Sequence, residues 1–192
     1  MFITWLRRNN WSAGILAIAR IFVGWQFLHA GWEKLTGPTA FTALGFLKGA
    51  VANPVLSPAK TVQYPWFVHF LNGFAIPNVG VINVFVSWGE LLVGIGLITG
   101  TLTTAAMFFG MLMNFMYLFS GTISQNPLDI LLGIFIIVAG YNAGRYGADF
   151  WVIPKLRKYV HNMVSDDVVF PKGTGSGTGA GTRTGDGAAM RH

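Results

Sequence analysis

The chain has 192 residues, of which 53% are hydrophobic and only 10% are charged, against roughly 25% charged residues in an ordinary soluble domain. So few charges cannot solvate the surface of a soluble globule, and 16 Phe and 7 Trp are too many aromatic residues for a mostly disordered chain. The absence of cysteine excludes disulfides, thiolate metal sites, CxxC redox centres and cysteine nucleophiles.

The lysine and arginine residues that give the chain its formal net charge of +6 all lie outside a long central stretch. Between Thr61 and Gly144 the only charged residues are Glu90 and Asp129, and this stretch is therefore predicted to be embedded in a membrane. Lysine and arginine residues lie on both sides of it. The positive charge thus indicates a topology signal and an attraction to anionic lipid, and no nucleic-acid partner is predicted.

The predicted fold class is all-α, an integral membrane four-helix bundle. After a cytoplasmic N-terminus over residues 1–10, the first helix is expected at 11–32. An outer segment, 33–77, is expected to form two short amphipathic or re-entrant pieces, or else to anchor the protein at the interface through its aromatic residues. Three further helices approach the roughly 20 residues that cross the hydrocarbon core and are expected at 78–99, 101–120 and 127–144.

The helices and the outer segment form one predicted transmembrane domain, 11–160. Residues 161–192 are rich in glycine and are predicted to be a disordered cytoplasmic tail. Basic residues near both ends place both termini in the cytoplasm and the protein in the inner membrane. A cleaved signal peptide is the rival interpretation of the first helix, but Arg20 interrupts its apolar run and no clean cleavage site follows.

Two layers of polar side chains follow from counting the helical rise of about 1.5 Å per residue from the cytoplasmic ends. Arg20 and Glu90 both lie about 13 Å deep by this count and are expected to face each other, as a structural strut or as part of a site. A second layer lies roughly 20 to 27 Å from the cytoplasmic side and takes residues from all four helices. Its members are Gln26, His29, Asn83, Asn114 and Asp129.

The second layer admits two interpretations. Asparagine side chains often hydrogen-bond one transmembrane helix to another, which would make the layer purely structural. Five polar residues beneath an aromatic outer segment, with Trp32 and Lys34 just above them, are more than such bonding requires. We therefore favour a ligand or redox site in this layer.

Several short motifs resemble one known family. Arg20 and Gly24, followed by His29-Ala-Gly-Trp-Glu-Lys34, resemble the first helix of the DoxX family, and Glu90 with Gly94, Gly96, Leu97 and Gly100 resembles its second-helix signature. Gly144-Arg-Tyr-Gly-Ala-Asp149 resembles the ending of the DoxD-like branch, whose members are commonly called thiosulfate:quinone oxidoreductase large subunits. The residues that this resemblance singles out are Arg20, Gly31, Lys34, Glu90, Gly100, Arg145 and Asp149.

The resemblance implies a bacterial or archaeal membrane protein that passes electrons from thiosulfate to membrane quinone, together with a small partner subunit encoded elsewhere. Arginine can hold an oxyanion or a quinone carbonyl, and acidic or histidine side chains can relay the protons that quinone reduction needs. The predicted catalytic residues are Arg20, Glu90, His29 and Asp129. The predicted substrate- or quinone-binding residues are Gln26, Trp32, Lys34, Asn83, Trp88 and Asn114.

No resident redox cofactor or metal is predicted, because the chain has no GxGxxG motif and no iron–sulfur spacing. Haem b is disfavoured, since His29 and His69 would have to converge as its axial ligands. Quinone is predicted to be the electron acceptor. The protein is expected to contact the lipid bilayer, and the sequence is compatible with a homo-oligomer. Two other functions stay as alternatives: a non-catalytic membrane scaffold of a redox or stress-response complex, and a small-solute or proton conductor.

Overall fold

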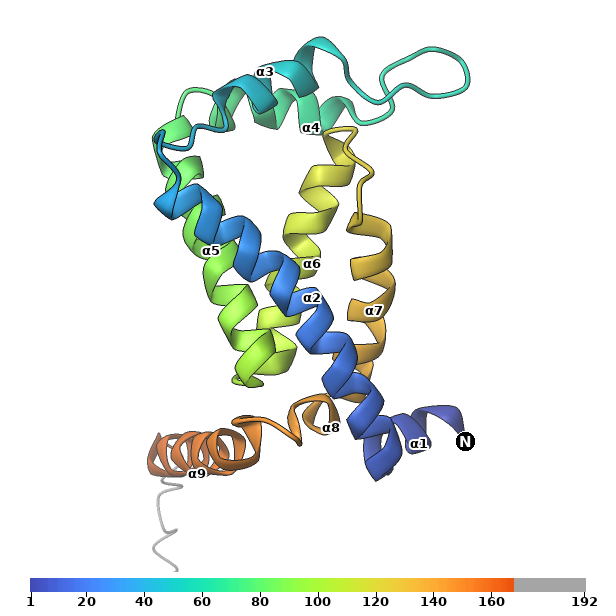
Figure 1. Ribbon diagram of the computed structural model, residues 1–192, viewed down its shortest axis with the longest axis vertical. Helices are drawn as coiled ribbons and strands as arrows, with labels where there is room; N and C mark the ends of the chain where they lie inside the picture. Colours follow the sequence, from blue (N-terminus) through green and yellow to red (C-terminus); the bar gives the residue numbers. More distant parts are fainter. Residues whose placement is uncertain (168–192) are drawn as a thin grey trace, which may run out of the picture.

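The computed structural model describes residues 1–167, and its regular elements there are all helices. Helices α2 (Asn10–Thr36), α5 (Val79–Thr99), α6 (Thr103–Phe119) and α7 (Asn126–Ala139) run side by side as a bundle (Figure 1). The all-α class is therefore confirmed. By length and composition, α2 and α5 are candidate membrane spans, while α6 and α7 are shorter apolar helices.

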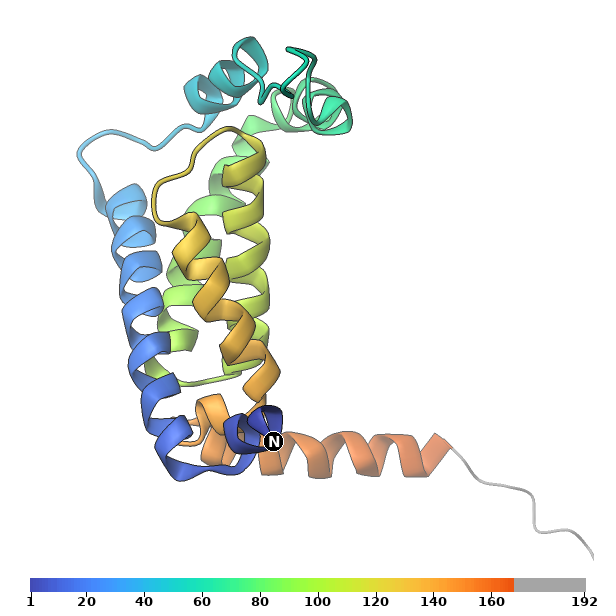
Figure 2. The same cartoon turned by 90° about the vertical axis from the view of Figure 1, so that its right-hand side faces the viewer.

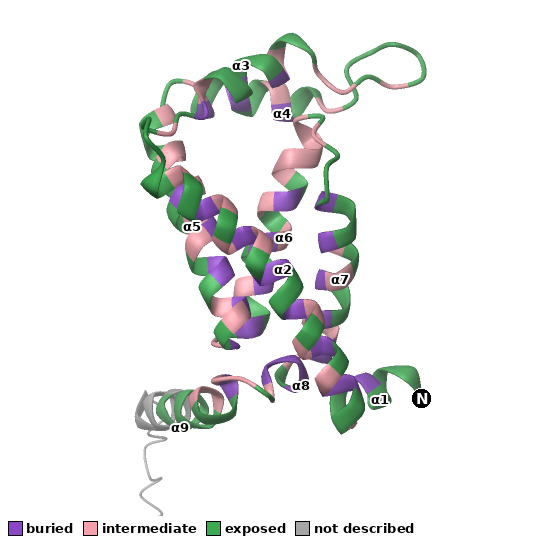
Figure 3. Cartoon of the chain, viewed as in Figure 1, coloured by how far each residue is buried: buried purple, intermediate pink, exposed green. Residues whose placement is uncertain are grey.

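Large apolar side chains cover the outside of this bundle. Many of the outward-facing positions are exposed (Figure 3), and Ile18 and Phe85 have exposed fractions of 73% and 71%. An exposed apolar surface of this extent is expected on a protein that contacts lipid, because in water it would be an aggregation hazard. The hydropathy of the helices and the burial pattern thus agree on a membrane protein.

Glycines bring α2 and α5 together. A Cβ atom added to Gly31 would lie 2.5 Å from the backbone nitrogen of Leu91, and one added to Gly24 would lie 2.8 Å from the Cβ of Leu97. Small residues allow two helix backbones to approach closely in a membrane bundle. These two contacts fix the register of the pair, so that Gly24 lies opposite Leu97 and Gly31 opposite Leu91.

The region predicted as an outer segment covers one end of the bundle, which we call the capped end. It forms α3 (Leu44–Ala52), α4 (Pro65–Phe70) and a π-helical turn, η1 (Leu71–Ala75), which lie across the ends of α5 and α6 (Figures 1 and 2). The cap has its own apolar core, into which Met116 and Phe119 of α6 pack. The buried members of this core are Ala43, Leu47, Ala50, Phe67, Leu71 and Ala75.

The opposite end, which we call the basic end, carries α1 (Phe2–Arg8), α8 (Tyr141–Gly144) and α9 (Asp149–Asp167). Helix α9 leaves the bundle roughly at right angles to its helices (Figure 2). Apart from the buried Arg20, the basic residues of this end within the described part of the chain are Arg7, Arg8, Arg145, Lys155, Arg157 and Lys158.

Two predicted ranges differ from the structure. The fourth helix, predicted at 127–144, is interrupted at Gly140, whose φ of 58° favours glycine, and α7 and α8 lie on either side of it. Residues 161–167, predicted as the start of a disordered tail, belong to α9. The rest of that predicted tail lies outside the described residues.

Candidate functional site

Arg20 lies at the basic end and is only 2% exposed. Its guanidinium donates hydrogen bonds to the backbone carbonyls of Leu97 at 2.6 Å, Ile98 at 3.1 Å and Tyr146 at 3.0 Å. The last carbonyls of a helix have no partner within it, and a cation there also interacts favourably with the helix dipole. Arg20 therefore caps the end of α5 and ties it to the segment before α9.

Asp149 binds the free backbone N–H groups at the start of α6, as Arg20 binds the carbonyls at the end of α5. Its carboxylate accepts hydrogen bonds from the backbone N–H groups of Leu102 at 2.6 Å and Thr103 at 2.9 Å. The backbone N–H of Asp149 in turn donates to the carbonyl of Gly100 at 2.7 Å. An acidic side chain at a helix N-terminus satisfies free N–H groups there. Arg20 and Asp149 thus hold the α5–α6 hairpin from both sides of its turn.

The prediction that Arg20 faces Glu90 is wrong. The register of α2 and α5 places Arg20 at the end of α5, beside Gly100, whereas Glu90 lies beside Gly31. The depth count failed because it assumed that both helices begin at the same level. In the structure, the first residues of α2 extend past the end of α5 and pack against α1 and α8.

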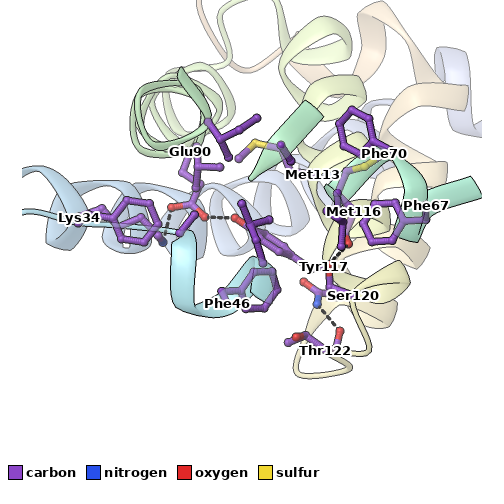
Figure 4. Close-up of a pocket in the computed structure, with 18 of the residues that line it drawn as sticks. Lys34, Phe46, Phe67, Phe70, Glu90, Met113, Met116, Tyr117, Ser120 and Thr122 are labelled. Atoms are coloured by element: carbon purple, nitrogen blue, oxygen red, sulfur yellow. Dashed lines mark hydrogen bonds and ion pairs between the residues drawn. The ribbon is translucent and has the colours of Figure 1, made fainter. Parts of the chain in front are cut away.

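Glu90 is at the centre of a chain of side chains near the capped end. It is 3% exposed, and its Oε2 accepts a hydrogen bond from Lys34 Nζ at 2.6 Å. Its Oε1 accepts a hydrogen bond from the Tyr117 hydroxyl at 2.5 Å (Figure 4). The ammonium of Lys34 also lies 5.4 Å from the centre of the Phe41 ring. The Lys34–Glu90–Tyr117 chain thereby connects α2, α5 and α6.

A cavity of about 500 Å³ adjoins this chain, between the bundle and the cap; we call it the capped cavity. Lys34, Glu90 and Tyr117 contribute its charged and phenolic groups, and Ser120, Thr122, Ser124 and Asn126 add smaller polar ones. The volume is within the range of small-molecule sites, which are typically apolar with a few polar groups. Most of the remaining wall is aromatic or aliphatic, including Phe41, Phe46, Phe67, Phe70, Met113 and Met116 (Figure 4).

A second cavity of about 210 Å³ adjoins the capped cavity and shares Glu90 with it; we call it the polar cavity. Gln26, Asn114 and Asp129 line it, as do Glu90 and Tyr117, which also line the capped cavity. Gln26 Nε2 donates to Asp129 Oδ1 at 3.2 Å. The Nδ2 of Asn114 is buried and has no hydrogen-bond partner within residues 1–167. The structure therefore brings three residues of the predicted second layer together.

The remaining predicted site residues lie outside both cavities. His29 is exposed and lies 3.7 Å from Glu33, and Trp32 and Trp88 face away from the bundle. Asn83 Oδ1 accepts a hydrogen bond from the backbone N–H of Ala43 at 2.8 Å, and so fastens the cap to α5. In the part of the chain that the structure describes, no group of three or more His, Asp or Glu residues converges as a metal site would require.

Sequence reasoning missed Tyr117 and the apolar wall of the capped cavity. A signal for Tyr117 was present, because it follows Asn114 by three residues and so shares a face of α6 with it. No comparable signal marked Phe46, Phe67 or Phe70 as cavity residues. Their apolar spacing indicates a buried face but not the partner against which that face packs.

The comparison with protein families gives one match. A family model described as DoxX matches residues 15–122, which is more than half of the chain. The matched range begins in α2 and ends just after α6, so it includes Arg20 and the whole Lys34–Glu90–Tyr117 chain. The segment with Arg145 and Asp149 lies beyond it. No curated protein and no solved structure matches the chain.

Proposed function

The chain belongs to the DoxX family of membrane proteins, and from that premise we propose that it is a membrane subunit that binds and reduces quinone in the capped cavity. One observation carries the proposal. A largely apolar cavity of about 500 Å³ meets a buried carboxylate that is hydrogen-bonded to a half-buried ammonium and a half-buried phenol. Such a site suits a ligand with an apolar ring and polar carbonyl groups.

The side chains around the cavity fit the two halves of a quinone. The ring would lie among phenylalanine and methionine side chains, which offer aromatic and sulfur contacts. A carbonyl oxygen would accept a hydrogen bond from Tyr117 or Lys34, in place of the bond that either now gives to Glu90. Reduction to quinol takes two electrons and two protons. Tyr117 and Lys34 would deliver the two protons, and Glu90 would take up protons from solvent, one at a time, and pass one back to each of them.

We further propose that the electrons come from a small reduced sulfur donor, as in the DoxD-like branch. Two thiosulfate ions join through a new S–S bond and give tetrathionate, and the two electrons released reduce one quinone together with two protons. The motif over residues 144–149, which resembles the ending of that branch, supports this proposal. A separately encoded partner subunit would supply any thiolate chemistry, since this chain has no cysteine.

The proposed arrangement in the membrane has four crossings, by α2, α5, α6 and α7, with the basic end in the cytoplasm and the capped cavity on the outer side of the inner membrane. The distribution of charge supports it, because cytoplasmic ends carry an excess of lysine and arginine. Seven such residues, Arg20 included, lie at the basic end of the described chain, while Lys34, Lys48 and Lys60 lie near the capped end. Lys34 is paired with Glu90.

The test uses the full chain purified in mild detergent. Bound quinone is extracted and counted for the wild type, Glu90→Gln, Tyr117→Phe and a matched control, Glu33→Gln, which makes the same chemical change at an exposed carboxylate. We expect quinone in the wild type and in Glu33→Gln, and its loss from the two cavity variants. A wild type that carries no quinone and takes up none when quinone is added would contradict the proposal and favour a scaffold.

A further inference from the structure

Arg145, at the basic end, is not used by the proposed function. It lines a surface cavity of about 350 Å³ together with Tyr146, Gly147, Phe150 and Trp151. Within the described residues, the ion pair Lys34–Glu90 and the close contact His29–Glu33 lie near the other end of the bundle, so neither involves this guanidinium. The cavity therefore offers a cation beside three aromatic rings.

Within residues 1–167, no ion pair joins a carboxylate to this cation. Asp149 is the acidic residue closest in sequence, but its two oxygens accept hydrogen bonds from the backbone N–H groups of Leu102 and Thr103. Helix α9 then adds Lys155, Arg157 and Lys158 to the same end. The surface around the cavity thus carries an excess of positive charge, which attracts an anion.

The cavity lies at the level where a candidate membrane span ends. The backbone N–H of Ala148 donates to the carbonyl of Thr99, the last residue of α5, at 3.0 Å. Lipid headgroups lie just beyond the ends of membrane spans, and aromatic side chains are enriched at that depth. Tyr146, Phe150 and Trp151 are each more than half exposed there, as residues of such a belt are.

Helix α9 has the character of a helix that lies on a membrane surface. Val152, Ile153, Leu156 and Tyr159 share one face by their helical spacing, and Leu156 and Tyr159 are exposed. Lys155, Arg157 and Lys158 occupy the flanks and the opposite face. Because α9 runs roughly at right angles to the bundle (Figure 2), this apolar face can enter the headgroup layer while the basic residues contact phosphate groups.

We propose that the Arg145 cavity binds the phosphate group of an anionic phospholipid in the leaflet at the basic end. The guanidinium would bind the phosphate through two parallel hydrogen bonds, and the lipid chains would pack against Phe150 and Trp151. This site is independent of the quinone site. It would hold α9 on the membrane surface and keep the α8–α9 connection in place beneath the α5–α6 hairpin.

The experiment compares lipid retention by native mass spectrometry. Delipidated full-length protein in mild detergent is incubated with equal amounts of phosphatidylglycerol and phosphatidylcholine of the same chain length. We expect the wild type to retain more phosphatidylglycerol and Arg145→Gln to lose that preference by more than about fivefold, because about fivefold is the effect of any one basic residue near an anionic surface and the paired hydrogen bonds of Arg145 add to it. Arg145→Lys keeps the charge but not the paired hydrogen bonds, and should lose part of the preference.

Arg8→Gln is the matched control, because it removes one exposed positive charge from the same end. If Arg8→Gln lowers the preference as much as Arg145→Gln does, the effect is one of net charge and the site does not exist. A wild type without preference overturns the proposal too. Inorganic phosphate, added alone, distinguishes the sources of the anion: if it displaces phosphatidylglycerol fully at millimolar concentration, the ligand is a soluble phosphate. An unchanged thermal unfolding midpoint without added lipid shows that the variants are folded.

Discussion

The two ends of the bundle both hold buried charges but use them differently. At the basic end, the hydrogen bonds of Arg20 and Asp149 go to backbone groups of the α5–α6 hairpin and its neighbours. At the capped end, Glu90 bonds to the side chains of Lys34 and Tyr117 and lines two cavities. The contacts of Arg20 and Asp149 with the backbone hold helix ends in place. A charge bound to side chains beside a cavity can exchange those partners for a ligand.

The largest effect is expected from Arg20→Ala. The substitution leaves the backbone carbonyls of Leu97, Ile98 and Tyr146 without their hydrogen-bond donor, and each buried acceptor left unsatisfied typically costs about 1–3 kcal/mol. We expect a strongly lowered thermal unfolding midpoint in detergent, while Arg8→Ala, at an exposed position of the same end, stays close to the wild type. A stable Arg20→Ala protein that has lost quinone would move the functional site to the basic end.

Glu90→Gln tests the other end. The amide keeps the shape of the side chain but removes the charge and cannot relay protons to Tyr117 and Lys34, and general acid–base catalysis contributes about a hundredfold or more to rate. We expect quinone reduction by the assembled complex to fall by that factor, with a smaller loss of stability than Arg20→Ala shows. Glu33→Gln should reduce quinone at the wild-type rate. Equal rates in Glu90→Gln and the wild type would remove Glu90 from the mechanism.

Asp149→Ala tests whether the charged residues of the basic end stabilise the fold and do not bind quinone. Loss of a helix N-cap costs about 0.5–2 kcal/mol, and Asp149 caps α6 through both of its oxygens. The unfolding midpoint should drop by less than in Arg20→Ala, and the quinone content per folded protein should not change. Quinone loss at unchanged stability would contradict this assignment.

Gln26→Leu is expected to have the smallest effect. It removes the hydrogen bond to Asp129 across the polar cavity, and such bonds between helices in a membrane average about 0.6 kcal/mol. Thermal unfolding measured beside Gln63→Leu, a change at an exposed residue of the cap loop, should show a small difference. A loss as large as that in Arg20→Ala would mean that the polar cavity, too, holds the fold together.

The sequence predicts helices well here and contacts between helices only in part. Hydropathy was sufficient to predict the all-α class, because a long apolar segment in a membrane must satisfy its own backbone hydrogen bonds, which a helix does. The helical rise also brought Gln26, Asn114 and Asp129 to one level, where they line the polar cavity. It failed for Arg20 and Glu90, since the levels at which α2 and α5 begin depend on how α1 and α8 pack.

The sequence also did not predict which way each side chain points from its helix. His29 follows Gln26 by three residues, yet Gln26 lines the polar cavity and His29 is exposed, because only a narrow stripe of α2 faces the bundle interior. The glycines of α2 and α5 indicated packing, but their register became clear only in three dimensions. The capped cavity depends on how α3 and α4 fold back over α6, which no local pattern records.

The most direct test of the account is to locate the quinone. A photoreactive quinone analogue is crosslinked to the full-length protein in nanodiscs, with and without excess natural quinone, and the labelled residues are identified by mass spectrometry. We expect labelling at the capped cavity, on α3, α4 or the outer half of α6. Excess natural quinone should suppress this labelling, and Glu33→Gln should leave it unchanged. Quinone-sensitive labelling around Arg20 and Tyr146 instead would show that the basic end is the site and that the two ends have been assigned the wrong way round.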